Sequence, residues 1–276
     1  MKKSIFFVNT YGCPDVEHNL SKMFALMNEY NISGLQIPYD DLLKLDRDEF
    51  KRHLTENGTE LVCTHIVQRL FAKDDIDFDN ALNVCREALE YISFFGCKYL
   101  MPTAFYTADV DGFSDKERAR ERLAEGLEIL TKESEKYGIR IIVENISQTI
   151  LPFSTVEDIE YLINRVPELD FCFDTGNFVC IKADAVEAFE RLKDKISMVH
   201  VKDFGICQSG GYKCDSGINV EHVDFGTGGA SLCDVMKKLT EYKPDIPYII
   251  EIHSCCPEKS AIEQACDFFD EIKVKL

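Results

Sequence analysis

The sequence predicts an α/β protein whose strands close into a single-domain (β/α)8 TIM barrel. Eight strand-like and about eight helical segments follow one another in strict alternation, which is typical of parallel βαβ units. The length of 276 residues is near the about 250 residues of one such barrel. An open doubly wound sheet also fits the alternation. The count of eight, and polar residues at the ends of many strands rather than at one crevice, favour the closed barrel.

The predicted strands are short apolar runs rich in β-branched and aromatic residues. They span residues 4–9, 34–38, 60–65, 99–101, 140–143, 171–173, 197–201 and 248–252. Pro102 is expected to stop the fourth strand, because proline lacks the N–H that a sheet ladder needs.

The predicted helices place apolar residues at helical spacing between these strands. They span residues 15–30, 40–57 (in one or two pieces), 78–95, 115–137, 155–164, 184–195, 231–242 and 258–275. Ser114 with Glu117, and Ser154, are expected N-caps. Gly96 and Gly138 are expected to end the helices before them.

The chain shows no low-complexity linker and no shift in composition, so we expect one domain over residues 1–276. The longest irregular stretch, 204–229, is rich in glycine. Loops of that length are usually functional or disordered.

The net charge of -18 argues against a nucleic-acid partner and against an anionic membrane surface, since both are bound largely through Lys and Arg. No apolar run approaches the roughly 18 residues of a membrane span. The start of the chain resembles a signal peptide, but polar Asn9 and Thr10 interrupt its apolar run, so a first strand explains it better. We therefore expect a cytoplasmic protein.

Twelve scattered cysteines form no C-x-x-C pair, which favours buried thiols in a reducing compartment over a disulfide framework. Cys255 with Cys256, and Cys207 with Cys214, are the pairs for which metal binding or oxidation stays an alternative.

Four predicted strands finish on residues of the kind that bind metals: Glu144, Asp174, His200 and Glu251. Burying a lone carboxylate is costly, so these charges need a cation, a hydrogen-bond cluster or water at a rim. The carboxyl ends of barrel strands meet at one face, where three carboxylates would repel one another unless neutralised. The set matches one divalent ion such as Mn²⁺, Mg²⁺ or Co²⁺, with Zn²⁺ as an alternative.

The segments VEN (143–145), FDTGN (173–177), HVKD (200–203) and IIEIH (249–253) together resemble the sugar phosphate isomerase/epimerase family. This is the xylose isomerase-like TIM barrel superfamily, which includes ketose 3-epimerases, inosose dehydratases and endonuclease IV. The resemblance implies a metal site made by Glu144, Asp174, His200 and Glu251. In the epimerase branch it also implies that Glu144 and Glu251 form the catalytic acid/base pair.

The candidates for substrate binding are His65, Asn177, Lys202 and His253. His65 ends a predicted strand and is alternatively a structural residue. We expect strand alternation to turn Lys202 away from His200, so that it reaches the site only where the strand ends, with a salt bridge, for example to Asp203, as the alternative.

The glycine turn at 226–229 precedes a predicted helix and suggests either a tight turn or a phosphate held on backbone N–H groups.

The chain departs from the family pattern at Asn177, where histidine is frequent, and at Gln36, where many members carry glutamate. The stretch 221–224 lacks the Asp-x-His ligands of endonuclease IV, and together with the acidic charge this disfavours DNA repair.

The resemblance implies an isomerase or epimerase of a small sugar, polyol or sugar phosphate that works by proton transfer through an enediolate. The alternatives are a metal-dependent dehydratase of the inosose type and a non-catalytic sugar-binding barrel. The expected partner is a small carbohydrate, and a homo-oligomer stays open.

Overall fold

The computed structural model describes residues 1–104, 116–229, 231–252 and 257–274. Eight parallel strands form a closed barrel in the order β1-β11-β7-β6-β5-β4-β3-β2. The predicted (β/α)8 TIM barrel is therefore confirmed. The barrel strands are β1 (Lys2–Phe6), β2 (Gly34–Pro38), β3 (Glu60–Val67), β4 (Tyr99–Thr103), β5 (Arg140–Glu144), β6 (Asp170–Asp174), β7 (Ile196–Val201) and β11 (Pro247–Ile250).

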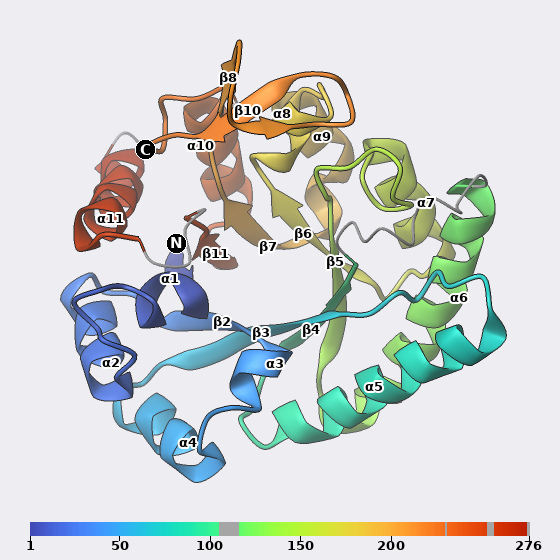
Figure 1. Cartoon of the computed structure of the whole chain (residues 1–276), viewed down its shortest axis with the longest axis horizontal. Helices are drawn as coiled ribbons and strands as arrows, with labels where there is room; N and C mark the ends of the chain where they lie inside the picture. Colours follow the sequence, from blue (N-terminus) through green and yellow to red (C-terminus); the bar gives the residue numbers. More distant parts are fainter. Residues whose placement is uncertain (105–115, 230, 253–256, 275–276) are drawn as a thin grey trace.

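Helices surround the strands on the outside of the barrel (Figure 1). They are α1 (Phe7–Tyr11), α2 (Leu20–Glu29), α3 (Tyr39–Leu42), α4 (Arg47–Glu56), α5 (Asp75–Ser93), α6 (Lys116–Ser134), α7 (Val156–Arg165), α8 (Asn177–Cys180), α9 (Ala185–Leu192), α10 (Leu232–Tyr242) and α11 (Lys259–Val274). Short 3-10 turns follow α6 (η2, Glu135–Tyr137) and α9 (η3, Lys193–Lys195). Among the described residues, no helix is long and apolar enough to cross a membrane.

The barrel encloses its own apolar core, separate from the larger core between strands and helices. Its members include Tyr99, Met101, Ile142, Cys172, Met198 and Ile249. Side chains on a strand alternate between the two faces, so the residue two positions after an inward-facing one also faces inward. Two positions after five of these core members, at the carboxyl ends of the strands, the residues are polar: Thr103, Glu144, Asp174, His200 and Glu251.

Most predicted elements are present, and the errors lie at their ends. Residues 7–9, expected in the first strand, are helical, and α2 begins at Leu20 rather than at residue 15. Asn19 caps α2 by accepting a hydrogen bond from the N–H of Lys22. Gly96 and Gly138 have the positive φ angles expected of residues that end helices. The predicted N-cap Ser114 lies outside the described residues.

Pro102 does not stop β4, which continues to Thr103. Beyond Leu100 the strand pairs only with β3, because its register with β5 covers Tyr99 and Leu100 alone. A proline is tolerated where no neighbouring strand needs its N–H.

The cap of α7 is Thr155 rather than Ser154. The hydroxyl of Thr155 accepts from the N–H of Asp158, and the Asp158 carboxylate accepts from the N–H of Thr155, which is a capping box. The same carboxylate is buried and pairs with Lys116 at 2.6 Å and Arg120 at 3.1 Å on α6. Asp158 therefore joins two helices.

The long stretch after β7 is ordered into a three-stranded antiparallel sheet, in the order β8-β10-β9. Its strands are β8 (Phe204–Cys207), β9 (Tyr212–Lys213) and β10 (Asn219–His222). It contacts the segment after β5, where Gln148 donates to the Tyr212 hydroxyl at 3.4 Å and Thr149 donates to Asp215 at 2.7 Å. Figure 1 shows β8 and β10 outside the ring of barrel strands, close to α8.

We predict that Asp158→Ala lowers the free energy of unfolding by about 3 kcal/mol or more, because it leaves two partly buried cations without their carboxylate and removes the capping box. Urea unfolding measures the loss. Glu157→Ala is the matched control, since Glu157 is exposed and its ion pair with Arg191 lies at the surface, and should cost at most about 1 kcal/mol. Equal losses in the two variants would contradict this role.

Candidate metal centre

Four ligand-type side chains meet at the carboxyl end of the barrel. Glu144 and Asp174 end β5 and β6, His200 lies on β7, and Glu251 directly follows β11. Each offers one ligand atom, and these atoms all lie within 4.8 Å of one another. Because β5, β6, β7 and β11 are consecutive neighbours in the barrel, their inward-facing ends converge without any bend in the chain.

His200 is held between the cluster and β2. Its Nδ1 lies 2.8 Å from Oε1 of Glu144 and 3.3 Å from Oε2 of Glu251. On the other side of the ring, Nε2–H donates to Oε1 of Gln36 at 2.9 Å. Both ring nitrogens face oxygens that can only accept, so without a metal the ring carries both protons, and Nδ1–H donates to Glu144. Gln36 also keeps the proton on Nε2 when the Nδ1 proton is lost, so that Nδ1 would then offer its lone pair toward the carboxylates.

Asp174 is positioned by the turn that follows it. Oδ1 accepts from the backbone N–H groups of Gly176 (2.9 Å) and Asn177 (2.8 Å). The side chain of Asn145 bonds the backbone of Asp174 on both sides, accepting from its N–H at 2.9 Å and donating to its C=O at 3.1 Å. Oδ2 is buried and faces the cluster, where the ammonium group of Lys202 is its ion-pair partner.

Lys202 reaches the cluster as well. Its Nζ lies 3.0 Å from Oδ2 of Asp174 and 2.5 Å from Oε1 of Glu251. The expectation that strand alternation turns Lys202 away from His200 was wrong, because residues two apart on a strand share a face. β7 does end at Val201, just before this lysine.

The carboxylate of Asp203, the alternative partner suggested for Lys202, lies at the glycine turn. Its Oδ2 instead accepts from the N–H groups of Gly226 (2.9 Å) and Gly228 (3.0 Å). These two N–H donors are therefore occupied by Asp203, which supports a tight turn rather than a phosphate-binding turn.

In the cluster, burial and neighbouring charges shift the pKa values of the side chains in opposite directions. Burial raises the pKa of Asp174 to about 7, with Lys202 acting in the other direction. Burial also acts to raise the pKa of Glu251, but Lys202 and His200 outweigh it and hold that pKa well below its usual range. For His200, Cys172 and Glu144 outweigh the effect of burial and hold the pKa well above its ordinary value. The protein thus neutralises its carboxylates with Lys202 and His200.

A cavity of about 280 Å³ opens beside the cluster. Glu144, Glu251, Asn177, Lys202 and His65 line it. Further lining residues that the sequence analysis did not connect with the site are Phe6, Met101, Thr103, Ile146, Ser147, Gln148, Phe204, Tyr212 and His222. Strand alternation on β4 could have predicted that Thr103 faces the site. The lining residues on β8, β9 and β10 come to the cavity through contacts between segments far apart in sequence, which no local pattern predicts.

The other predicted substrate-binding residues differ in their surroundings. Asn177 donates from Nδ2 to the C=O of Asn145 at 2.9 Å and lies 3.5 Å from Oε1 of Glu144, so it connects two strand ends. Burial lowers the pKa of His65 to about 4, which makes its imidazole neutral at pH 7. His253 lies outside the described residues.

The described cysteines are free thiols, most of them buried. Cys207 donates to the C=O of Gly210, and Cys214 is buried. Cys255 and Cys256 lie outside the described residues.

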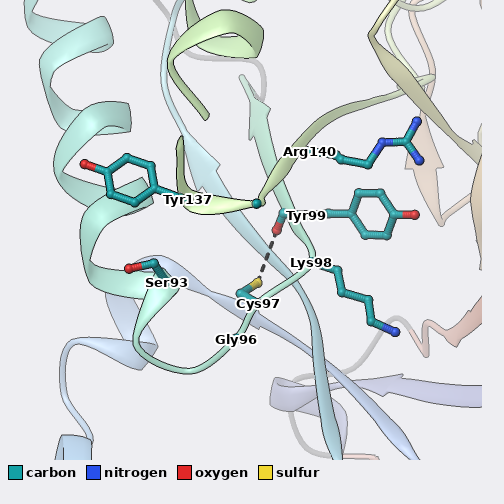
Figure 2. A pocket seen from close by; sticks show the side chains of 8 residues that line it. Ser93, Gly96, Cys97, Lys98, Tyr99, Tyr137 and Arg140 are labelled. Atoms are coloured by element: carbon teal, nitrogen blue, oxygen red, sulfur yellow. Dashed lines mark hydrogen bonds between the residues drawn. The ribbon is translucent and has the colours of Figure 1, made fainter. Parts of the chain in front are cut away.

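A second hollow of about 250 Å³ lies at the opposite end of the barrel, where β4 and β5 begin (Figure 2). There Lys98, Tyr99 and Arg140 extend to the same side, and the thiol of Cys97 donates to the C=O of Tyr99. Lys98 pairs with Glu60 and Arg140 with Asp170. The charged side chains Lys98 and Arg140 of this hollow are thus paired. Residues at this end of a TIM barrel normally contribute to stability.

The donor set fits a divalent metal ion. Three carboxylates and one imidazole suit Mn²⁺, Mg²⁺, Co²⁺ or Zn²⁺. Oδ2 of Asp174 and Nδ1 of His200 lie 3.9 Å apart and face the same centre. Within the described part of the chain, this is the group of His, Cys, Asp and Glu side chains placed closely enough to hold an ion.

Comparison with known proteins agrees with the barrel fold. The sequence profile of the xylose isomerase-like TIM barrel family matches residues 24–272. No curated protein matches the chain in sequence.

Solved structures share the fold at low identity. The IOLI protein with a bound zinc atom has a TM-score of 0.79 and 17% identity, over 100% of this chain and 99% of its own. D-psicose 3-epimerase with D-tagatose, from Clostridium cellulolyticum H10, has a TM-score of 0.77 and 14% identity, over 99% of both chains. The probable 3-DHS dehydratase AsbF from Bacillus anthracis has a TM-score of 0.75 and 14% identity, over 98% of this chain and 99% of its own.

We predict that Lys202→Met lowers the unfolding free energy of the metal-free protein by about 3 kcal/mol at pH 7, because Asp174 and Glu251 lose a buried cation. The loss should shrink as the pH falls, since protonation removes the repulsion between carboxylates. Titration calorimetry should show that the variant binds Mn²⁺ at least as tightly as the wild type, because the competing ammonium group is gone.

The control is Lys132→Met, which removes an exposed helix pair with Glu128 and should cost about 0.5 kcal/mol or less. A Lys202→Met protein as stable as wild type without metal would contradict the counter-ion role.

Proposed function

Because this chain belongs to the xylose isomerase-like TIM barrel family, we propose that it is a divalent-metal-dependent isomerase or epimerase. Its substrate is a small sugar, polyol or sugar phosphate. The observation that carries the proposal is the convergence of Glu144, Asp174, His200 and Glu251 at the carboxyl ends of four neighbouring strands. This is the face at which TIM-barrel enzymes keep their active sites. The fold shared with D-psicose 3-epimerase and with the zinc-bound IOLI protein supports it.

The same four residues would hold one metal ion, with Mn²⁺, Mg²⁺ or Co²⁺ preferred for a carboxylate-rich set and Zn²⁺ as the alternative. When bound, the ion supplies Lewis-acid stabilisation of the negative charge that develops on the substrate oxygens. Asn145 and Gln36 hold Asp174 and His200 in place for this role.

Glu144 and Glu251 are the proposed acid/base pair. In the barrel, β5 and β11 lie on either side of β6 and β7, so the two carboxylates flank Asp174 and His200. Both line the cavity. One carboxylate can remove a proton from carbon, leaving an enediolate, and the other can return a proton from the opposite side. Lys202, Asn177 and His65 line the same cavity and are the proposed substrate contacts.

A dehydratase is the second candidate. Removal of the same proton followed by loss of a neighbouring hydroxyl would eliminate water, and this requires no change in the position of the acid/base pair. The fold shared with the probable 3-DHS dehydratase AsbF supports this second candidate. The third candidate is a barrel that binds a sugar without catalysis.

We predict that the protein binds one equivalent of Mn²⁺ or Co²⁺ and that saturating metal raises its thermal stability. At a metal concentration of 100 Kd the gain is about 2.7 kcal/mol, because the ion binds only the folded state. Metal analysis of the purified protein and thermal unfolding with and without a chelator measure both effects. Asp174→Asn is the comparison variant, and it should lose the metal-dependent gain. A wild-type protein that melts identically with and without metal would reject the metal site.

We predict that Glu251→Gln keeps the fold and much of the metal affinity but abolishes C–H exchange, because the amide cannot accept the proton. The assay incubates the metal-loaded protein with a ketose panel in D₂O and follows deuterium incorporation by NMR. Epimerisation or isomerisation appears as exchange at carbon, and dehydration as loss of water.

The matched control is Glu258→Gln, an exposed position outside the cavity lining, which should retain exchange. Exchange that survives in Glu251→Gln would remove Glu251 from the acid/base pair. A protein that binds metal and ketose without any exchange would support the non-catalytic alternative.

A further inference from the structure

Three buried polar atoms along one side of the cavity have no hydrogen-bond partner. They are Nε2 of Gln36, Nδ1 of His65 and Oγ1 of Thr103. All three residues line the cavity beside the metal centre. Gln36 has 0% and Thr103 has 2% of its surface exposed, so solvent hardly reaches either side chain. An unsatisfied buried polar group costs about 1–3 kcal/mol, which a native site tolerates where a ligand completes the bonds.

These three residues form a row on neighbouring strands. Gln36 lies on β2, His65 on β3 and Thr103 on β4, which are adjacent in the barrel. Thr103 follows Tyr99 and Met101 on the inward face of β4, and Gln36 lies between Leu35 and Ile37, which pack in the outer core. The ligand cluster comes from β5, β6, β7 and β11. The cavity therefore has a charged half and a neutral polar half.

Gln36 connects the two halves. Its Oε1 accepts from Nε2–H of His200, so this bond fixes the orientation of the amide. The NH₂ group is then the part without a partner, and it is available as a donor to a ligand in the cavity. An amide here differs from the glutamate that the family pattern suggested, because a carboxylate could accept from His200 but could not donate.

The row is built for neutral oxygens rather than for phosphate. Among the described lining residues the one lysine or arginine is Lys202, and two carboxylates already neutralise it. The N–H groups of Gly226 and Gly228 are bound to Asp203. Hydroxyl, amide and neutral imidazole groups match the hydroxyls of a polyol, which both donate and accept.

We propose that Gln36, His65 and Thr103 form a hydroxyl-binding row that selects an unphosphorylated polyhydroxy substrate, with its reacting carbons at the cluster and its remaining hydroxyls on β2, β3 and β4. This assignment rests on the proposed function for the location of the substrate, but binding by the row can be measured without turnover.

The first test is Thr103→Val, which removes the hydroxyl and keeps the shape. Since Oγ1 has no partner in the free protein, the variant should melt no lower than wild type. Binding of D-tagatose and D-fructose to the Mn²⁺-loaded protein should weaken about 3- to 10-fold, the worth of one neutral hydrogen bond. Saturation-transfer NMR titration measures the affinity.

The matched control is Thr59→Val. Thr59 also carries a buried hydroxyl without a partner, but it precedes β3 at the opposite end of the strand and does not line the cavity. This variant should leave ketose affinity unchanged. Equal weakening in both variants, or none in Thr103→Val, would overturn the role of Thr103.

The second test is Gln36→Glu, which keeps an acceptor for His200 and removes the donor toward the cavity. Metal should still bind at one equivalent, while ketose affinity should fall. Loss of metal with unchanged ketose affinity would make Gln36 a positioning residue for His200 alone and remove it from the row.

The substrate class is tested with each ketose against its phosphate monoester, on the wild-type protein. The neutral ketose should bind at least 10-fold more tightly. A tighter monoester, or no measurable binding of any neutral ketose at millimolar concentration, would overturn the assignment. If a neutral ketose binds through Thr103 but shows no C–H exchange, the proposed function is rejected and the hydroxyl-binding row is supported. If only monoesters show exchange, the proposed function is supported and the row is rejected.

Discussion

The site depends on the confinement of three carboxylates in a buried space. Glu144, Asp174 and Glu251 lie with His200 in one cluster whose ligand atoms are within 4.8 Å of one another. Buried charges of one sign are stable only when paired, and Lys202 and His200 supply the opposing charge here. A closed sheet is what holds the arrangement, because strand ends tied on both sides cannot separate to relieve the repulsion. The need to neutralise these carboxylates is thus a consequence of the fold.

The residues around the cluster convert this charged centre into a shaped site. Asn145 and the turn after β6 orient Asp174, and Gln36 orients His200, so two of the four cluster residues are fixed by neutral neighbours. The mouth of the barrel is divided accordingly. Strands β5, β6, β7 and β11 carry the charges, whereas β2, β3 and β4 carry neutral polar groups with unfilled hydrogen-bonding capacity. The charged groups and the neutral polar groups thus lie on different halves of the ring of strand ends.

The fold was predictable because its signal is local and repeated. Each apolar run between amphipathic segments indicated a strand, and the errors fall where short-range contacts decide an end, such as residues 7–9, Pro102 and the cap at Thr155. The four ligand-type residues were visible for the same reason, since each terminates an apolar strand. The misjudged orientation of Lys202 was an error in applying strand alternation, which places residues 200 and 202 on one face. The small sheet in 204–229 was not foreseen, because its strands are short and pair antiparallel within a glycine-rich stretch.

The sequence by itself determined the alternating elements, the barrel they form and the identity of the residues that end its strands. These properties follow from the period-2 and period-3.6 placement of apolar side chains, which is written along the chain. Only the tertiary structure decided which charges pair, that Lys202 contacts Asp174 and Glu251, that Asp203 occupies the glycine turn, and that Gln36, His65 and Thr103 face one cavity with unpartnered atoms. Such pairings join residues far apart in sequence, and their distances depend on how the closed barrel sets neighbouring strands in register.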